Sequence, residues 1–410
     1  MFALFFGAGN LILPPQLGFR SGELWWPVAL GFCLSAVLIP VLGILAHAKL
    51  QGTMFDFGKE VSPTFSLIYC YLVYAISIAL PSARTASVTH EMAVAPFFHS
   101  PAWLTSLVYF MFVFLFTMNR SRILDLIGKW LTPIILTVLV LIIILSLTSF
   151  HPSDVHHLTG SFSQGILEGY QTFDAIGAVV VGGVILVSVN LKENKASYSQ
   201  KKSLIGMAAW LSGTALFLIY TGLIYSGSLF QGEFDPSISR TALLAEMGTS
   251  TLGLAANAFL SLLVSLACFT TAVGIVTGTA DFVKSRFPAA PFAYGLTASI
   301  GCLTGVLMGQ FPVAAIIVYA LPALMFIYPL TIVLILMNVV PRRYAAPRIF
   351  RVVVVTTLLF SIPDFLNSMG FDLGNVVQYI PLSSYGIGWV LPALASFLFG
   401  NLLRSHSKGN

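Results

Sequence analysis

Two apolar stretches carry the residues best suited to hold an ion and a small polar molecule. The first is FFGAGNLILPP at residues 5–15, which combines Gly7, Gly9 and Asn10 with the adjacent prolines Pro14 and Pro15. Glycine permits backbone angles that other residues resist, and proline lacks an amide hydrogen and crowds the residue before it. We therefore predict a broken helix, whose free amides attract a carboxylate and whose free carbonyls can coordinate Na⁺. A glycine-rich helix contact with a proline kink is the alternative.

The second stretch is GYQTFDAIGAVVVGGVILVSVN at residues 169–190. It places Asp174 in apolar surroundings, followed by Gly177, Gly182 and Gly183. A charged side chain inside a membrane span costs roughly 2.5–3.5 kcal/mol on insertion scales, so it usually has a partner or a function. Four roles stay open for Asp174: ligand of a second cation, proton carrier, partner of a substrate amine, or cap of the free amides of a broken helix.

The composition indicates a membrane-embedded chain. Of its 410 residues, 57% are hydrophobic and 9% are charged, whereas soluble domains have about 25% charged residues. The net charge of +5 reflects basic cytoplasmic loops rather than a nucleic-acid partner. The four cysteines, Cys33, Cys70, Cys268 and Cys302, lie in apolar stretches without a CxxC pair, so we expect neither a disulfide nor a metal site from them.

Twelve segments are long and apolar enough to cross the bilayer, which takes about 20 residues. They lie near residues 1–19, 25–47, 65–92, 102–118, 126–149, 166–190, 203–228, 250–283, 290–309, 312–339, 349–367 and 385–403. The sequence therefore predicts an all-α polytopic membrane protein with one transmembrane domain over 1–410.

The basic residues test this count independently. With the N-terminus inside, Arg20 and Arg240 fall in external loops and Arg84 lies within the third span. All other lysines and arginines fall in predicted cytoplasmic loops: Lys49, Lys59, Arg120, Arg122, Lys129, Lys192, Lys195, Lys201, Lys202, Lys284, Arg286, Arg342, Arg343, Arg348, Arg351, Arg404 and Lys408. This alternation supports twelve spans with both termini in the cytoplasm.

Two predicted external loops have features of their own. A helical pattern at 239–247 indicates either a lid over an outward-facing cavity or a plain surface helix. The stretch HPSDVHHL at 151–158 has three histidines and an aspartate. Solvated loop histidines are the favoured interpretation there, with a metal site as the alternative.

Four motifs carry a family resemblance: FALFFGAGNLILPPQLG, PSARTASVTHEMAVAP, YQTFDAIGA and ACFTTAVGI. Together they resemble the bacterial branched-chain amino acid:cation symporters, the LIVCS or BrnQ-type carriers, over essentially the whole chain. That family is similar in turn to the LeuT-type fold. The resemblance implies a 5+5 inverted repeat, with helices 1–5 in 1–149, helices 6–10 in 166–339, and two further helices in 349–403. Breaks in the first and sixth spans fit such a repeat, with the ligand site at the interface of the two halves.

The resemblance also implies the substrate site. The substrate would lie against residues of the first break: Phe5, Gly7, Ala8, Gly9 and Asn10. The sixth-span break around Phe173–Gly177, which includes Asp174, would lie opposite. Phe173 is the expected apolar wall for a leucine, isoleucine or valine side chain.

A cation site is implied in the same way. It would use the carbonyls of Ala3 and Phe6 and the hydroxyls of Thr270 and Thr271. Na⁺ prefers such oxygen ligands, by analogy with other hard cations. The alternative is that the two threonines only bond back to their own helix.

Arg84 and Glu91 are seven residues apart in the third span. Two helical turns place them on one face about 10 Å apart along the axis, too far for a tight ion pair. We expect them to face a shared aqueous vestibule or neighbouring helices, with a structural or gating role rather than substrate contact.

Only six residues precede Gly7, which is too short for the first half-helix to cross half a bilayer. We therefore expect the first helix to be truncated and the native protein to have residues upstream of Met1.

Taken together, these features predict secondary active uptake of leucine, isoleucine and valine across the plasma membrane of a bacterium. A cation, Na⁺ in preference to H⁺, would drive this uptake by a monomer that needs no cofactor. A carrier of the same fold for another neutral amino acid is the nearest alternative. An enzyme is disfavoured because DxxD, HExxH and GxSxG arrangements are absent from the spans, and direct ATP drive because GxxxxGK[ST] is absent. A channel is disfavoured because no filter sequence repeats.

Overall fold

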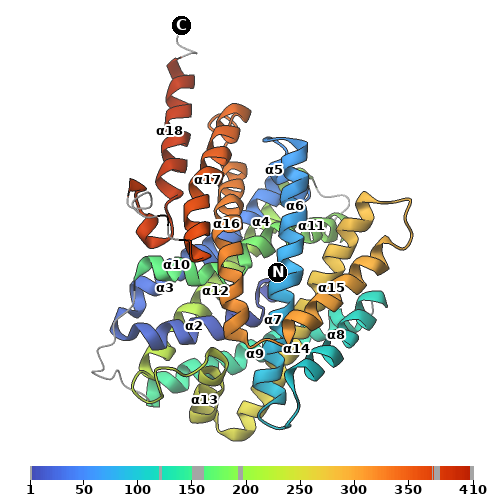
Figure 1. Ribbon diagram of the computed structural model, residues 1–410, viewed down its shortest axis with the longest axis vertical. Helices are drawn as coiled ribbons and strands as arrows, with labels where there is room; N and C mark the ends of the chain where they lie inside the picture. The colour runs from blue at the N-terminus through green and yellow to red at the C-terminus, as the bar shows by residue number, and fades with distance from the viewer. Residues whose placement is uncertain are drawn as a thin grey trace.

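The computed structural model describes residues 2–119, 122–149, 161–192, 197–371, 373 and 379–406. Helices joined by turns make up these residues, with no strand among them (Figure 1). The histidine-containing loop at 151–158 and Met1 lie outside the described residues.

A helix or a pair of consecutive helices occupies each predicted span. The first three spans contain α1 (Phe2–Phe5) and α2 (Ala8–Ser21); α3 (Trp25–Cys33) and α4 (Ile39–Leu50); and α6 (Pro63–Ser77) and α7 (Ala83–Thr89). The others contain α8 (Ala102–Met118), α9 (Arg122–Ser149), α10 (Phe162–Tyr170), α11 (Asp174–Lys192), α12 (Tyr198–Leu229), α14 (Leu254–Arg286), α15 (Ala293–Gly309), α16 (Val313–Val339), α17 (Pro347–Ser368) and α18 (Val390–His406). Between spans lie α5 (Met54–Gly58) and α13 (Arg240–Leu252).

The helices identify a multi-pass membrane protein. Among the described residues, six helical segments are long and apolar enough to cross a membrane, and five shorter helices are also apolar. The assignment of twelve crossings in a 5+5 repeat stays a prediction.

The first predicted break is present, but the prolines do not cause it. Helix α1 ends at Phe5 and α2 begins at Ala8, with Gly7 between them in an extended conformation (φ −105°, ψ −174°). Pro14 and Pro15 lie inside α2, so their predicted role in the break is wrong. Prolines are tolerated in membrane helices where neighbouring helices hold the backbone. Here α12 passes so closely that a Cβ on Gly227 would lie 2.1 Å from the Pro15 carbonyl oxygen.

The sixth span is interrupted as well. Helix α10 ends at Tyr170 and α11 begins at Asp174. Between them, Phe173 has a φ of 63°, a left-handed conformation that costs a bulky residue free energy and is common at functional sites. The break therefore lies at 171–173 and shares only Phe173 with the predicted break at Phe173–Gly177. Gly177 falls inside α11.

Close backbone packing holds the two interrupted helices against their neighbours. A Cβ on Gly18 of α2 would lie 1.7 Å from the Ile224 carbonyl oxygen of α12. A Cβ on Gly165 of α10 would lie 2.1 Å from the Val28 carbonyl oxygen of α3. Small residues that let backbones approach are the usual packing device of membrane helices. The sequence therefore fixes how closely these helices can approach.

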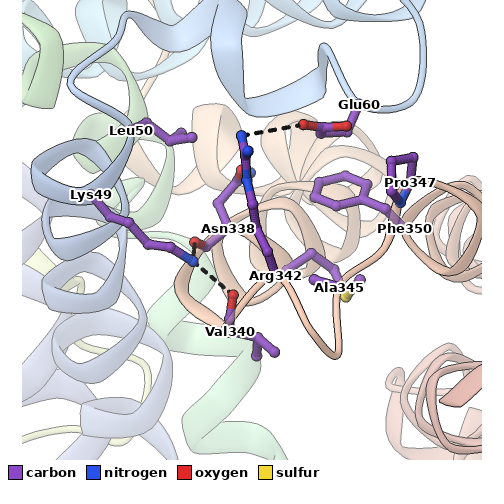
Figure 2. Close-up of a pocket in the computed structure, with 10 residues that line it drawn as sticks. Lys49, Leu50, Glu60, Asn338, Val340, Arg342, Ala345, Pro347 and Phe350 are labelled. Atoms are coloured by element: carbon purple, nitrogen blue, oxygen red, sulfur yellow. Dashed lines mark hydrogen bonds and ion pairs between the residues drawn. The ribbon is translucent and has the colours of Figure 1, made fainter. Parts of the chain in front are cut away.

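Two of the loops predicted to be cytoplasmic, after α4 and after α16, meet at one end of the molecule. Lys49, at the end of α4, donates hydrogen bonds to the carbonyls of Asn338 and Val340 at 2.8 and 2.7 Å, which caps the C-terminus of α16 (Figure 2). Nearby, Arg342 lies 3.9 Å from the Glu60 carboxylate. Helix α13 lies at the opposite end from α5, α17 and α18 (Figure 1). Which of these two ends faces the cytoplasm stays a prediction.

Candidate functional site

The two interrupted helices meet at one buried asparagine. The Asn10 side-chain amide in α2 donates to the Phe5 carbonyl at 2.7 Å and to the Asp174 carboxylate at 2.8 Å. It also contacts the Tyr220 hydroxyl of α12. Asn10 and Asp174 are only 1% and 4% exposed, so these bonds lie inside the protein. The structure therefore joins the break of the first span to that of the sixth.

The Asp174 carboxylate contacts other helices rather than capping its own. Besides Asn10, the Tyr220 hydroxyl donates to it at 3.3 Å. The amides at the start of α11 have other acceptors, since the Asp174 amide lies 3.2 Å from the Thr172 hydroxyl and the Ala175 amide 3.3 Å from the Tyr328 hydroxyl. This arrangement argues against the capping role and leaves the carboxylate as a link between α11, α2 and α12.

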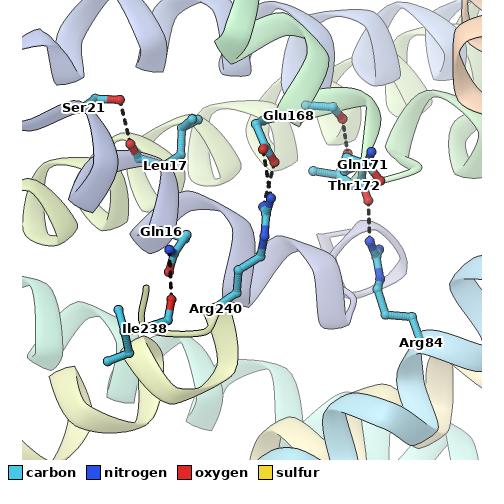
Figure 3. A network of polar contacts seen from close by, with 10 residues as sticks. Gln16, Leu17, Ser21, Arg84, Glu168, Gln171, Thr172, Ile238 and Arg240 are labelled. Atoms are coloured by element: carbon cyan, nitrogen blue, oxygen red, sulfur yellow. Dashed lines mark hydrogen bonds and ion pairs between the residues drawn. The ribbon is translucent and has the colours of Figure 1, made fainter. Parts of the chain in front are cut away.

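Arg84 also lies between the two breaks. Its Nη1 donates to the Gln171 carbonyl at 2.7 Å (Figure 3), and its guanidinium lies 5.4 Å from the centre of the Phe173 ring. A Cβ on Gly9 would lie 2.3 Å from its Nη2, so the guanidinium packs directly on the start of α2. Arg84 is 3% exposed. Of the two predicted placements, Arg84 therefore has the one against neighbouring helices and not the one in an aqueous vestibule.

Glu91 lies in a different place from Arg84. It accepts hydrogen bonds from the Thr241 hydroxyl of α13 and, at 2.8 Å, from the Val313 amide at the start of α16. The common face predicted for the two residues assumes an ideal helix, whereas π-helical turns at Ile78–Ser82 and His90–Val94 flank α7. Such turns change the phase of the side chains. Arg84 therefore reaches the breaks, and Glu91 reaches α13 and the start of α16.

Among the residues predicted for a cation, Thr271 lies next to the first break. The hydroxyls of Thr270 and Thr271 each donate to the Ala267 carbonyl at 2.9 Å, which is the bond back to their own helix named as the alternative. A threonine oxygen that donates its hydrogen keeps lone pairs for a cation. A Cβ on Gly7 would lie 3.6 Å from the Thr271 hydroxyl, so α14 adjoins the break. Ala3 lies in α1 and Phe6 in the break itself.

Several residues of the site have no distinctive signal in the sequence. Tyr220 and Tyr328 are two of 14 tyrosines, and Gln171 and Thr172 are unremarkable beside Asp174. Only the packing of α12 and α16 against the breaks brings the tyrosines to this place. Asp174 is the signal that does identify the region, since a carboxylate in an apolar span needs partners.

Residues in and just before α13 bond to three other elements, and Figure 3 shows two of these contacts. Arg240 forms two parallel bonds with Glu168 of α10, at 2.7 and 2.9 Å. The Gln16 amide of α2 donates to the Ile238 carbonyl, just before α13, at 3.2 Å, and Thr241 bonds to Glu91. One face is fully buried through Leu243, Leu244 and Met247. The opposite face exposes Ala242 and Glu246, so the lid and the surface helix both stay open as interpretations of this segment.

Residues 1–407 match the sequence profile of a family described as "Branched-chain amino acid transport protein". The chain belongs to this family. Its members are carriers rather than enzymes. A branched-chain amino acid permease, BraB, of Bacillus subtilis is 31% identical over 98% of this chain and 93% of its own length. A branched-chain amino acid transport system 2 carrier protein of Pseudomonas aeruginosa is 31% identical over 95% of this chain and 91% of its own.

Solved transporter structures share the fold of this family member. Mhp1, a nucleobase-cation-symport-1 family transporter, has a TM-score of 0.55 at 15% identity and covers 100% of this chain and 92% of its own. A mutant of the manganese transporter of Eremococcus coleocola has a TM-score of 0.59 at 15% identity, and the match covers 97% of this chain and 92% of that protein. At this identity the likeness concerns the fold alone.

Proposed function

We propose that the protein imports branched-chain amino acids by symport with a cation, Na⁺ in preference to H⁺. The observation that carries this proposal is the buried Asn10–Asp174 bond, which joins two interrupted helices in one place. Interrupted helices offer free amides and carbonyls inside a membrane, where irregular backbone survives only against protein or a cavity. Family membership supports the choice of substrate.

The proposed substrate site lies between the breaks. The start of α2 at Gly7–Gly9 would hold one end of the amino acid, and the 171–173 break with Asp174 and Gly177 of α11 would lie opposite. Phe173 would pack on the aliphatic side chain. The carbonyls of Ala3 and Phe6 and the hydroxyls of Thr270 and Thr271 would bind Na⁺, because oxygen donors suit a hard cation. Within the described residues no group of three histidines, cysteines or acids competes with this choice.

The proposed mechanism is alternating access. Helix α13 closes the external end through Arg240–Glu168 and Thr241–Glu91. The Cβ positions of Gly177, in the first turn of α11, and of Gly274 and Gly278, in the C-terminal half of α14, have no atom within 4 Å. In this proposal that space leads from the breaks toward the cytoplasm, as an inward-facing carrier requires. In this proposal the protein is a monomer in the bacterial plasma membrane, with twelve LeuT-type spans and both termini cytoplasmic.

The Arg240–Glu168 pair tests the closure directly. Arg240→Ala should favour opening of the external end, since contacting pairs contribute about 0.5–3 kcal/mol. Spin labels on the exposed positions Phe162 of α10 and Ala242 of α13 should show a new population at longer distance. The charge exchange Glu168→Arg with Arg240→Glu is the matched control and should restore the wild-type distribution. Unchanged distances in Arg240→Ala would mean that the pair does not hold the external end closed.

Labelled-leucine uptake into proteoliposomes tests the function. Saturable uptake should follow an imposed inward Na⁺ gradient and be inhibited by isoleucine and valine more than by phenylalanine or alanine. Separate pH gradients distinguish H⁺ coupling from Na⁺ coupling. Absence of leucine uptake under either gradient would contradict the proposed function. Stronger inhibition by phenylalanine or alanine would show that the substrate is another neutral amino acid.

A further inference from the structure

Resting on the proposed function, we propose that Arg84 binds the carboxylate of the amino acid substrate together with the first amides of α2. Substrates of this protein would then need an α-carboxylate, and Arg84 would be the residue that selects for it.

The first observation is that the buried guanidinium has an unused donor. Arg84 is 3% exposed, and its Nη1 donates to the Gln171 carbonyl at 2.7 Å. Its Nε is buried without a hydrogen-bond partner among the described residues. Buried donors are almost always paired, because an unpaired one loses its bonds with water. A carboxylate could accept from this donor, since arginine offers its donors in a planar fork that matches a carboxylate.

The second observation is the start of α2, against which the guanidinium packs. The helix has 14 residues, and the Asn10 amide bonds to the Gly7 carbonyl at 3.2 Å. The amides of Ala8 and Gly9 come earlier and have no acceptor within an α-helix. The Cβ position of Gly9 lies 2.3 Å from Nη2 of Arg84. Only a glycine at this position lets the guanidinium pack here without moving.

The charges favour an anion at this point. A helix start carries a partial positive charge, so a guanidinium beside it is unfavourable unless a negative group joins them. The hydrogen bonds of the Asp174 carboxylate go to Asn10 and Tyr220 and not to Arg84, although its charge acts on the guanidinium. A substrate carboxylate between Arg84 and the α2 amides would neutralise both. The substrate ammonium would then lie toward Asp174.

A purely structural role for Arg84 makes a different prediction. Fastening α7 to the Gln171 carbonyl uses one donor, which a lysine could supply. Carboxylate binding uses the fork and its position on Gly9, which a lysine could not reproduce. Arg84→Lys and Gly9→Ala therefore distinguish the two roles. In Gly9→Ala the new methyl group displaces the guanidinium while the arginine side chain itself is unchanged.

The test compares inhibition of labelled-leucine uptake by leucine and by leucinamide, which lacks the carboxylate. In wild type, leucine should be the better inhibitor by roughly ten-fold or more, as expected for a charge-assisted bond. Arg84→Lys and Gly9→Ala should raise the leucine concentration for half-maximal inhibition by a similar factor and leave that for leucinamide nearly unchanged. The matched control is Gly295→Ala in α15, where a Cβ would have only the Met118 side chain at 3.8 Å. It should keep the wild-type ratio.

Thermal unfolding of each purified variant shows whether it is folded. A folded Arg84→Lys that keeps the wild-type ratio of leucine to leucinamide would overturn the proposal, as would a wild type that does not discriminate between them. Gly9→Ala decides the question in the same way if the lysine variant does not fold. Absence of leucine uptake in the wild type contradicts the proposed function itself and is seen before any variant is made.

Discussion

Asp174→Asn is expected to raise the leucine concentration for half-maximal uptake roughly ten- to hundred-fold. The carboxylate accepts bonds from Asn10 at 2.8 Å and Tyr220 at 3.3 Å, and it is the acidic group that lies at the junction of the breaks. Hydrogen bonds to a charged group contribute about 1.5–3 kcal/mol each, and 1.4 kcal/mol is ten-fold in affinity. Labelled-leucine uptake at a series of Na⁺ concentrations and pH values measures the effect and shows whether the carboxylate acts on the substrate, on Na⁺ or on a proton.

A second buried carboxylate provides the matched control. Asp364 of α17 accepts hydrogen bonds from the Ser383 hydroxyl at 2.7 Å and from the Gly388 amide at 3.0 Å. Neither of these partners belongs to the interrupted helices. Asp364→Asn should reduce thermal stability and leave the half-maximal leucine concentration nearly unchanged. Asp174→Asn with wild-type uptake at every pH would remove Asp174 from the mechanism.

Gly18→Ala is expected to be the most damaging small substitution in α2. Its methyl group would lie 1.7 Å from the Ile224 carbonyl oxygen of α12, and a backbone atom cannot move aside as a flexible side chain can. Overpacking of this kind costs about 1–3 kcal/mol or more. Because Asn10 and Tyr220 lie on the same two helices, separation of α2 from α12 should also weaken the junction. The thermal unfolding midpoint and the yield of monodisperse protein measure the loss.

Gly206→Ala in α12 is the control for this substitution. Its Cβ would meet only the Leu45 side chain at 3.6 Å, an ordinary contact, and alanine favours a helix over glycine by about 1 kcal/mol. It should unfold at the wild-type temperature or slightly above. If Gly18→Ala were equally stable, the close packing of α2 on α12 would not be essential to the fold.

The helices were largely predictable because hydrophobic length is a strong signal in a membrane protein. The predicted segment 102–118 coincides with α8, and 312–339 agrees with α16 to within one residue. Interruptions in the first and sixth spans were also predictable, since Gly7 permits backbone angles outside a helix and Asp174 is costly in an ordinary span. The exact positions of these interruptions were harder to predict. Local sequence drew attention to Pro14 and Pro15, yet tertiary packing keeps α2 helical through both prolines.

The composition of the site depends on contacts that no local pattern encodes. Tyr220 bonds to Asp174 from 46 residues away. The different destinations of Arg84 and Glu91 follow from π-helical turns, which no spacing rule for ideal helices anticipates. The sequence identifies single polar residues whose burial in a span costs free energy. Their partners depend on how helices far apart in the chain pack together.

A structure determined with leucine and Na⁺ bound, by electron cryo-microscopy in a lipid nanodisc, tests the central claim most directly. We predict density for leucine between the start of α2 at Gly7–Gly9 and the 171–173 break, with its carboxylate on the Arg84 side. Leucine bound elsewhere, or residues 2–21 and 162–192 forming two uninterrupted helices with no ligand between them, would contradict the account.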